Sequence, residues 1–225
     1  GGKKMRKSFV VGLSILIALS FSACSNNSSS PSSSISSTKT SKKVVKQDSK
    51  KVSGPLTKVG TFSVRDGRKA TLVKIYHPAQ SLTFAEDGKQ VIVNIETIKI
   101  LQNDIQDPSI RSEIESAYKT SIPDNRFFSI QIDFKLVNKL GSDAYLEGFS
   151  TLTLGDRGLS HEQFYDPTPA VTVASGAGYS NNLAAVISES EVNLTRIGLA
   201  LENVDEPGQS SQLIQPTSTQ YFTLK

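Results

Sequence analysis

Apolar and polar residues alternate over most of the chain after its first quarter, a pattern typical of strands with one buried face. Two such runs, residues 58–64 and 69–76, lie on either side of an Asp66-Gly67 pair. Glycine accepts the positive φ of a tight turn, so an Asp-Gly pair between alternating runs predicts a β-hairpin.

Residues 90–101 and 126–140 are expected to form two longer strands. The alternation of the first slips at Glu96-Thr97, which predicts a β-bulge or a bend. In the second, every other residue is apolar, so one face of the strand is expected in the core and the other in water. The apolar face comprises Phe128, Ile130, Ile132, Phe134 and Leu136. The polar face comprises Ser129, Gln131, Asp133 and Lys135.

Residues 107–119 carry a different period. Asp107 suits a helix cap and Pro108 suits the first helical position. The apolar residues that follow fall at i, i+4, i+7 and i+8 and share one helical face. They are Ile110, Ile114, Ala117 and Tyr118. We therefore expect one short amphipathic helix laid across an end or an edge of the sheet.

Shorter runs complete the set of strands. Strands are expected at residues 145–154, 167–175, 194–201 and 221–224, and a loop at residues 176–182. Seven or more short strands with turn signals, and no alternating helices, predict an antiparallel β-sandwich. The expected fold class is therefore mainly β, with one sandwich domain over residues 58–225 and one short helix.

The layout of residues 127–158 adds a resemblance. A long alternating strand ends at Val137-Asn138, and a second strand is followed by Gly155-Asp156. This layout, with the late strand at residues 197–201, resembles the immunoglobulin-like extracellular domains of many bacterial lipoproteins. The resemblance implies an immunoglobulin-like sandwich but no particular activity. The helix at 107–119 and the long stretch at 159–193 depart from the usual compact layout of that family, so the strand order stays open.

The N-terminal segment has the composition of a secretory signal. Basic residues precede an apolar run at residues 9–21, which is shorter than the ~20 residues of a membrane-spanning helix and fits the central region of a signal peptide. The sequence Phe21-Ser22-Ala23-Cys24 resembles the lipobox of bacterial lipoproteins, although the family usually has leucine where Phe21 stands. The resemblance implies cleavage after Ala23, at the end of a signal peptide spanning residues 1–23. It also implies a diacylglycerol on the sulfur of Cys24.

Cys24 is the only cysteine of the chain, so the chain cannot form an internal disulfide, and lipidation gives the lone thiol a role. Two alternatives remain: an ordinary cleaved signal with an incidental cysteine, or an uncleaved anchor. A lipid-anchored chain is expected at the extracellular face of the cell membrane, in a Gram-positive envelope.

Residues 24–57 are expected to form a disordered tether. Nine of the 14 residues at 25–38 are serine, and six lysines follow by residue 51, so this segment lacks the apolar area that would offset its ordering entropy. The net charge of +4 is carried by the four basic residues before Cys24. A basic nucleic-acid-binding surface is therefore not expected.

Residues with catalytic or binding chemistry are few. His77 and His161 are isolated in sequence, the glycine-rich Ser175-Gly176-Ala177-Gly178 precedes no convincing helix, and the acidic residues at 104–115 lack a calcium-loop pattern. Tyr165 and Tyr179 are the candidates for an exposed sugar-binding aromatic, and both are expected to pack under loops instead.

We therefore expect no catalytic residues, no cofactor and no metal ligands. The expected partners are the lipid bilayer, through Cys24, and an envelope protein or a wall polymer. The expected role is a non-catalytic interaction module. The alternatives are a small-ligand receptor that serves a transporter and, as a third choice, an envelope enzyme.

Overall fold

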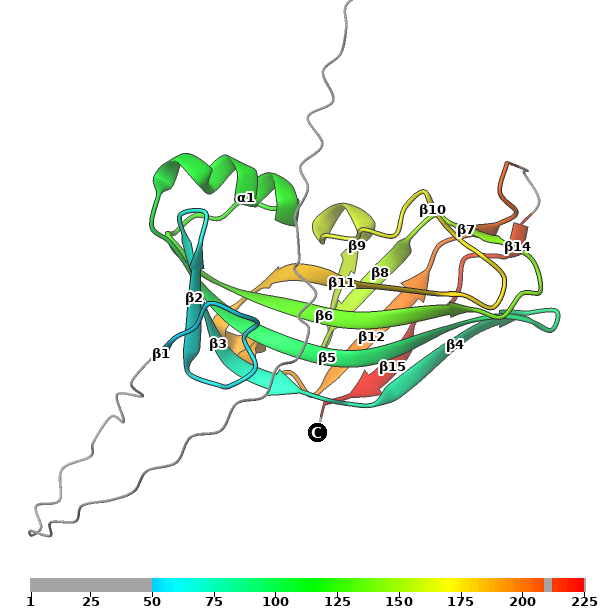
Figure 1. The fold of residues 1–225 in the computed structure, drawn as a ribbon, viewed down its shortest axis with the longest axis horizontal. Coiled ribbons are helices and arrows are strands. Elements are labelled where there is room, and N and C mark those ends of the chain that lie inside the picture. Colours follow the sequence, from blue (N-terminus) through cyan, green and yellow to red (C-terminus); the bar gives the residue numbers. More distant parts are fainter. Residues whose placement is uncertain (1–49, 209–211, 225) are drawn as a thin grey trace, which may run out of the picture. The chain divides into compact units, whose positions relative to one another are not determined.

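The computed structural model describes residues 50–208 and 212–224, which form a mainly β body with one α-helix (Figure 1). The predicted signal peptide at residues 1–23, the lipid attachment at Cys24 and residues 24–49 of the predicted tether lie outside the described residues. No helix within the described ranges is long and apolar enough to cross a membrane.

The largest sheet, sheet A, has seven strands in the order β1-β2-β3-β5-β6-β11, with β4 also paired to β5. Every pairing in it is antiparallel except the parallel pair of β1 with β2. Its strands are β1 (Lys50–Lys51), β2 (Thr61–Arg65), β3 (Arg68–Tyr76), β4 (Gln80–Glu86), β5 (Lys89–Ile105), β6 (Arg126–Asn138) and β11 (Gly178–Ile187).

Strand β5 is long because its two halves pair with different neighbours. Residues 89–95 pair with β4, and residues 98–105 pair with β3. The change falls at the irregularity between Ile95 and Thr97, where the register against β6 also shifts. The predicted bulge is therefore confirmed.

Two Asp-Gly turns close the hairpins of sheet A. Asp66 and Gly67 both have positive φ, +47° and +71°, and join β2 to β3 as predicted. Asp87 and Gly88 repeat this geometry between β4 and β5. Strand β4 was not predicted, although its turn carries the same signal.

Two four-stranded sheets lie opposite sheet A. Sheet B has the order β10-β7-β13-β14, and sheet C has the order β15-β12-β8-β9. The strands of sheet B are β7 (Ala144–Leu146), β10 (Val171–Val173), β13 (Val204–Asp205) and β14 (Gln212–Ile214). The strands of sheet C are β8 (Phe149–Leu154), β9 (Arg157–Ser160), β12 (Arg196–Leu201) and β15 (Gln220–Thr223).

Sheets B and C are connected through two neighbouring segments of the chain, each of which leaves one sheet and enters the other after a break of two residues. The chain passes from β7 to β8 through Glu147 and Gly148, and from β12 to β13 through Glu202 and Asn203. Backbone hydrogen bonds span the break, from Glu147 N to Asn203 O at 3.2 Å and from Glu202 N to Gly148 O at 3.0 Å. The single strand predicted at residues 145–154 is therefore two strands joined at a bend.

One hydrophobic core joins the three sheets. Its buried residues come from β4, β5, β6 and β11 on one side and from strands of sheets B and C on the other. Phe134 of β6 and Phe149 of β8 meet edge to face across it, with ring centroids 5.5 Å apart. The predicted core face of β6 is confirmed for Ile130, Ile132, Phe134 and Leu136, all fully buried.

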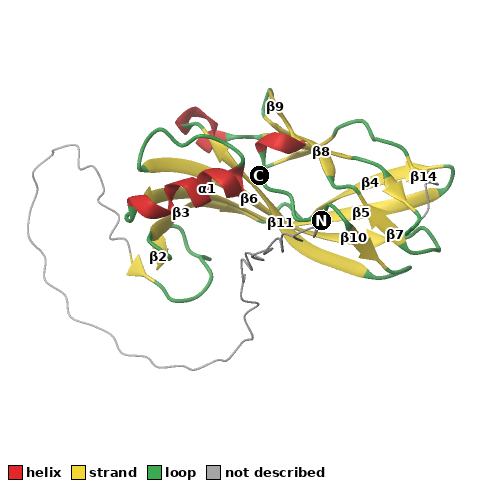
Figure 2. Cartoon of the chain, turned by 90° about the horizontal axis from the view of Figure 1, so that it is seen from above, coloured by secondary structure: helices red, strands yellow, loops and turns green. Residues whose placement is uncertain are grey.

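The opposite face of β6 is only partly in water, contrary to the prediction. Helix α1 (Arg111–Tyr118) lies across this face of sheet A (Figure 2), and its Ile114 and Tyr118 pack with Phe127 of β6. Ser129 is 1% exposed and accepts a hydrogen bond from Asn103 Nδ2 at 2.9 Å. The alternating pattern could not predict that α1 covers this face, because Ser129 is a polar residue whose hydroxyl is hydrogen-bonded under the helix.

The helix begins as predicted. A 3-10 turn, η1 (Pro108–Ile110), precedes α1, and Asp107 Oδ1 accepts a hydrogen bond from Ser109 N at 2.9 Å. The hydrogen bond from the Ser109 side chain lowers the pKa of Asp107, and the backbone bond lowers it further. The helix ends at Lys119, whose φ is +51°.

A second segment covers the same face of sheet A near β3. Leu56 is buried against Ala70, Leu72 and Leu101, and Val52 N donates to Phe62 O at 2.8 Å. Residues 50–57, which the sequence assigns to the tether, thus pack on the sheet in the part of the chain that is described.

Strand β11 replaces the loop predicted at residues 176–182, and this prediction is wrong. Ten residues of β11 pair with β6, from Gly178 opposite Val137 to Ile187 opposite Phe128. The polar run Ser180-Asn181-Asn182 resembles a loop in sequence. It forms a strand because β6 offers an unbroken partner edge along its whole length.

Single side chains connect the sheets at their edges. Gln220 of β15 uses its amide to pair with the backbone of Thr83 in β4, accepting from Thr83 N at 3.2 Å and donating to Thr83 O. At the other side, Arg157 of β9 donates to Val186 O of β11 at 3.1 Å. Arg157 also binds Glu191 of the turn η3 (Glu189–Asn193) at 2.6 Å.

Asp166 fixes the bend between β7 and β8. Its carboxylate accepts from Phe149 N at 2.6 Å and from Thr168 N at 2.9 Å. Gly148 has a φ of +112°, and a Cβ there would lie 2.8 Å from Asp166 Oδ2. Burial raises the pKa of Asp166, although the bonds from Thr168 and Phe149 and the charge of Lys119 oppose the rise.

The first prediction tests the core face of β6. Ile132→Ala removes a fully buried branched side chain and leaves a cavity, so we expect a loss of about 2–5 kcal/mol in the free energy of unfolding. Lys135→Ala, on the exposed face of the same strand, is the control and should cost less than about 0.5 kcal/mol. Urea unfolding measures both, and equal losses would contradict the assignment of faces.

The second prediction concerns pH. Because folding raises the pKa of Asp166, the folded state favours the protonated carboxyl, and this contribution is lost as pH rises from the unfolded value of about 3.9 through the folded value. Asp166→Asn cannot titrate. The free energy of unfolding of the wild type minus that of the variant should therefore fall as the pH rises above about 4. A difference that rises with pH would contradict the assignment.

Candidate functional site

The residues singled out for chemistry in the sequence lie apart from one another. His77 Nδ1 is 3.5 Å from Thr97 Oγ1, and His161 Nε2 is 3.9 Å from Glu162 Oε1. Both histidines are exposed. Across residues 50–208 and 212–224, no three His, Cys, Asp or Glu side chains gather in a way that could hold a metal ion.

Three of the four acidic residues at 104–115 have a structural partner. Asp104 Oδ1 accepts from Arg126 Nε at 2.7 Å, and this ion pair raises the pKa of Arg126. Asp107 caps the helix, and Glu115 Oε1 accepts from Ile122 N at 2.8 Å. These contacts join β5 to β6, cap the helix and tie it to the loop that follows, so the calcium alternative gains no support from this segment.

A carboxyl pair, Glu147 and Asp205, lies at the break in sheets B and C. Burial raises the pKa of Asp205, and the charge and hydrogen bonding of Glu147 raise it further. Asn203 Nδ2 donates to Glu147 Oε2 at 3.3 Å. Two carboxyl groups with different environments are the usual basis of acid–base catalysis, but neither lines the hollow described below.

The glycine-rich segment and the two predicted tyrosines are structural. Gly176 has a φ of +73°, and the chain continues into β11 rather than into a helix. Tyr179 donates to Pro167 O at 3.1 Å, and Tyr165 shares backbone hydrogen bonds with Ala184. Partial burial raises the pKa of Tyr165, with smaller contributions from Tyr179 and Asp166. Both tyrosines are half-buried, and neither offers an exposed ring.

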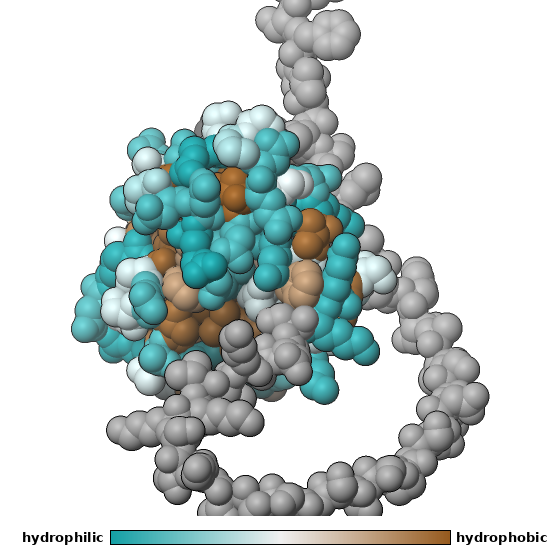
Figure 3. All heavy atoms as spheres, turned by 90° about the vertical axis from the view of Figure 1, so that its left-hand side faces the viewer, coloured by the Kyte–Doolittle hydropathy of each residue, from teal (hydrophilic) through white to brown (hydrophobic). Residues whose placement is uncertain are grey.

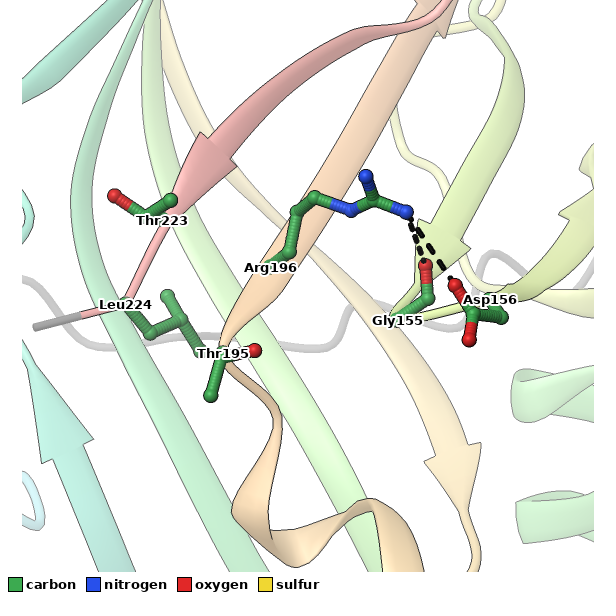
Figure 4. Close-up of a pocket in the computed structure, with 6 residues that line it drawn as sticks. All are labelled: Gly155, Asp156, Thr195, Arg196, Thr223 and Leu224. Atoms are coloured by element: carbon green, nitrogen blue, oxygen red, sulfur yellow. Dashed lines mark hydrogen bonds and ion pairs between the residues drawn. The ribbon is translucent and has the colours of Figure 1, made fainter.

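An open hollow of about 670 Å³ lies on sheet C, at the turn from β8 to β9 and the adjoining ends of β12 and β15 (Figure 4). It is lined by Gly155, Asp156, Thr195, Arg196, Thr223 and Leu224. Backbone bonds fix its floor, from Gly155 N to Arg196 O at 3.0 Å and from Leu224 N to Thr195 O at 2.9 Å.

Arg196 and Tyr221 form a stacked pair beside this hollow. The guanidinium lies 4.5 Å from the centroid of the Tyr221 ring. It also donates to Gly155 O at 3.5 Å and to Asp156 Oδ1 at 3.4 Å. Tyr221 is 49% exposed, more than any other large apolar side chain among the described residues.

The strand beneath Tyr221 provides space for its ring. Gly198 of β12 pairs with Tyr221 of β15. A Cβ at Gly198 would lie 2.7 Å and 2.8 Å from two ring carbons of Tyr221 and 2.6 Å from Thr219 Cγ2. The ring therefore lies over the backbone of Gly198, in space that a Cβ would occupy.

This arrangement suits recognition rather than bond chemistry. Tyrosine and arginine are enriched among the residues that dominate binding energy at protein interfaces. A cation above an aromatic ring adds about 0.5–1 kcal/mol at an exposed site, which favours the stacked arrangement before a partner arrives.

Sequence reasoning missed this site. Tyr221 lies in a predicted strand, and its neighbours in sequence give no sign of exposure. The signal that could have located it is the Arg196-x-Gly198 spacing in β12, which places a charge and an uncovered backbone on one face.

Comparison of the chain with protein-family models, with curated proteins and with solved structures found no match.

Proposed function

We propose that this chain is a membrane-anchored surface lipoprotein whose β domain is a non-catalytic interaction module of the bacterial cell envelope. The observation that carries the module is the exposed Arg196–Tyr221 pair on sheet C, where an ordered ring and a guanidinium face solvent together. The observation that carries the anchor is the sequence Phe21-Ser22-Ala23-Cys24.

An ordered aromatic side chain binds with little loss of conformational entropy. Contact with Arg196, the bare backbone at Gly198 and the pairing of β15 with β12 all hold Tyr221 in place. A partner that covers this ring buries a large apolar area. The guanidinium of Arg196 stays available to bind polar groups of the partner. The partner class is an envelope protein or a wall polymer.

The proposed architecture of residues 58–225 is an immunoglobulin-like sandwich. The antiparallel sheets that share one core support this proposal. Helix α1, which covers one face of sheet A, and the break at Gly148 between β7 and β8 are additions to the immunoglobulin-like layout.

The small-ligand alternative has one observation in its favour. The hollow of about 670 Å³ falls within the volume range of small-molecule sites. It is an open hollow on the sheet surface, whereas such sites usually enclose most of their ligand. We therefore prefer the interaction module.

The third prediction tests the anchor. Cys24→Ala removes the thiol that accepts the lipid. A fatty-acid probe supplied to growing cells should therefore not be incorporated into the variant protein. The precursor should then stay unprocessed or the protein should appear in the medium. Equal labelling of wild type and variant would reject the anchor, and Cys24→Ser serves as the isosteric control with the same expected loss.

The fourth prediction tests the recognition surface. The chain without its signal peptide is incubated with intact cells and with isolated envelope, and bound protein is measured at increasing concentration. Tyr221→Ser and Arg196→Ser should each weaken saturable binding by about thirtyfold, the effect of a residue that contributes about 2 kcal/mol. Thermal unfolding checks that each variant is folded.

Tyr145→Ser is the matched control, because Tyr145 is a half-buried tyrosine of sheet B, away from Arg196. It should leave binding unchanged. Equal binding by wild type and Tyr221→Ser would reject the surface. A small molecule retained by the wild type in native mass spectrometry, and lost in Arg196→Ser, would favour the receptor alternative.

A further inference from the structure

The charge of the described chain is divided between two regions. The N-terminal ribbon, which we define as residues 50–76 (β1 to β3 with their connections), holds seven Lys or Arg residues and one acidic residue. Its net charge is therefore +6. Residues 77–224 hold nine Lys or Arg and nineteen Asp or Glu, a net charge of −10.

Apolar side chains lie among these basic residues. Val59 and Val64 are 38% and 39% exposed, and with Tyr221 they are the exposed large hydrophobic residues within the described ranges. Val64 pairs with Lys69, and Phe62 pairs with Lys51. Because paired residues share a face, these four side chains lie on one side of the ribbon.

Phe62 and Lys69 are also in direct contact. Lys69 Nζ lies 4.6 Å from the centroid of the Phe62 ring. Figure 3 views the domain from this end, and apolar side chains are visible there among hydrophilic ones. The ribbon thus combines cations with a partly exposed apolar surface.

The ribbon is also where the rest of the chain joins the domain. The described chain begins at Lys50, in β1, and lysines 39, 42, 43 and 46 precede it in sequence. Cys24 is 26 residues before Lys50. The part of the domain that is nearest along the chain to the proposed anchor is therefore its basic end.

We infer that the N-terminal ribbon is a second interaction surface, which rests on the anionic phospholipid headgroups of a bilayer. Its cations are attracted to the negative surface potential, which falls off within a Debye length. Val59, Val64 and Phe62 supply the apolar contact typical of interfacial binding. The acidic remainder of the domain is repelled by the same surface, so the attraction orients the domain with its ribbon toward the membrane.

An anionic wall polymer would use the same cations but not the valines, because a soluble, strongly hydrated polyanion offers no apolar phase. The exposed valines among the cations therefore favour the bilayer. The inference does not depend on the Arg196–Tyr221 surface, which stays the same in every sample of the test, or on lipidation of Cys24, which the test removes.

The test uses residues 24–225 with Cys24→Ser in every sample, so that no lipid is attached. Co-sedimentation compares vesicles of phosphatidylcholine alone with vesicles of phosphatidylcholine and phosphatidylglycerol in equal parts. The parent protein should bind the anionic vesicles and not the neutral ones. Combined Lys50→Gln, Lys51→Gln and Lys58→Gln should lower the partition coefficient by about fivefold per lysine, about a hundredfold together.

The matched control carries Lys89→Gln, Lys135→Gln and Lys139→Gln. These positions change the net charge equally but lie at the opposite end of sheet A, where Val91 pairs with Asn138. They should leave vesicle binding close to that of the parent. Equal losses in the two triple variants would overturn the inference, because they would show that net charge alone acts.

The apolar contribution is tested with Val59→Ser combined with Val64→Ser, which should weaken vesicle binding but leave binding to soluble polyphosphate unchanged. Vesicle binding equal to that of the parent would overturn the assignment of a bilayer as the ribbon's partner. An anionic polymer would then be the partner that the cations favour. Thermal unfolding confirms that each variant is folded.

Discussion

The pairing of β5 with β6 is the constraint on which the rest of the structure depends. Thirteen residue pairs join the two strands, from Val91 opposite Asn138 to Asp104 opposite Arg126. The bulge after Ile95 adds one residue to β5, so that Ile98 and Ile100 return to the core face already occupied by Val93 and Ile95. Without this extra residue the second half of β5 would turn its apolar side chains outward.

The rest of sheet A and its cover are arranged around this pair. The bulge divides the free edge of β5 between β4 and β3, so that β3 pairs only with the second half of β5 and the N-terminal ribbon lies at that end of the sheet. The turn of the β2–β3 hairpin then meets the start of the helical segment, where Gln106 N donates to Gly67 O at 2.8 Å. A Cβ at Gly67 would lie 2.7 Å from Asp107 Cβ, so glycine is needed for this close approach as well as for the turn.

The layers are held together at their sides by polar side chains rather than by backbone pairing. Gln220 mimics a strand residue by meeting both backbone groups of Thr83, and Arg157 links β9 to β11 and to Glu191. Burial raises the pKa of Glu191, but the bonds from Arg157 and Ser188 outweigh burial and leave the pKa below its ordinary value. These contacts satisfy edge groups that would otherwise be available to another chain. They also leave the outer face of sheet C free to carry the Arg196–Tyr221 pair.

Elements with local signals could be predicted from the sequence alone. The Asp66-Gly67 hairpin, the helix start at Asp107, the bulge near Glu96 and the core face of β6 each follow from a turn residue, a cap or a period within one segment. Only the tertiary structure decided that residues 178–187 form a strand and that Ser129 lies under a helix. It also decided that Tyr221 is exposed while Tyr165 and Tyr179 are half-buried. Burial, strand pairing and exposure depend on which distant segment of the chain packs on a residue. The local pattern of apolar and polar residues does not identify that segment.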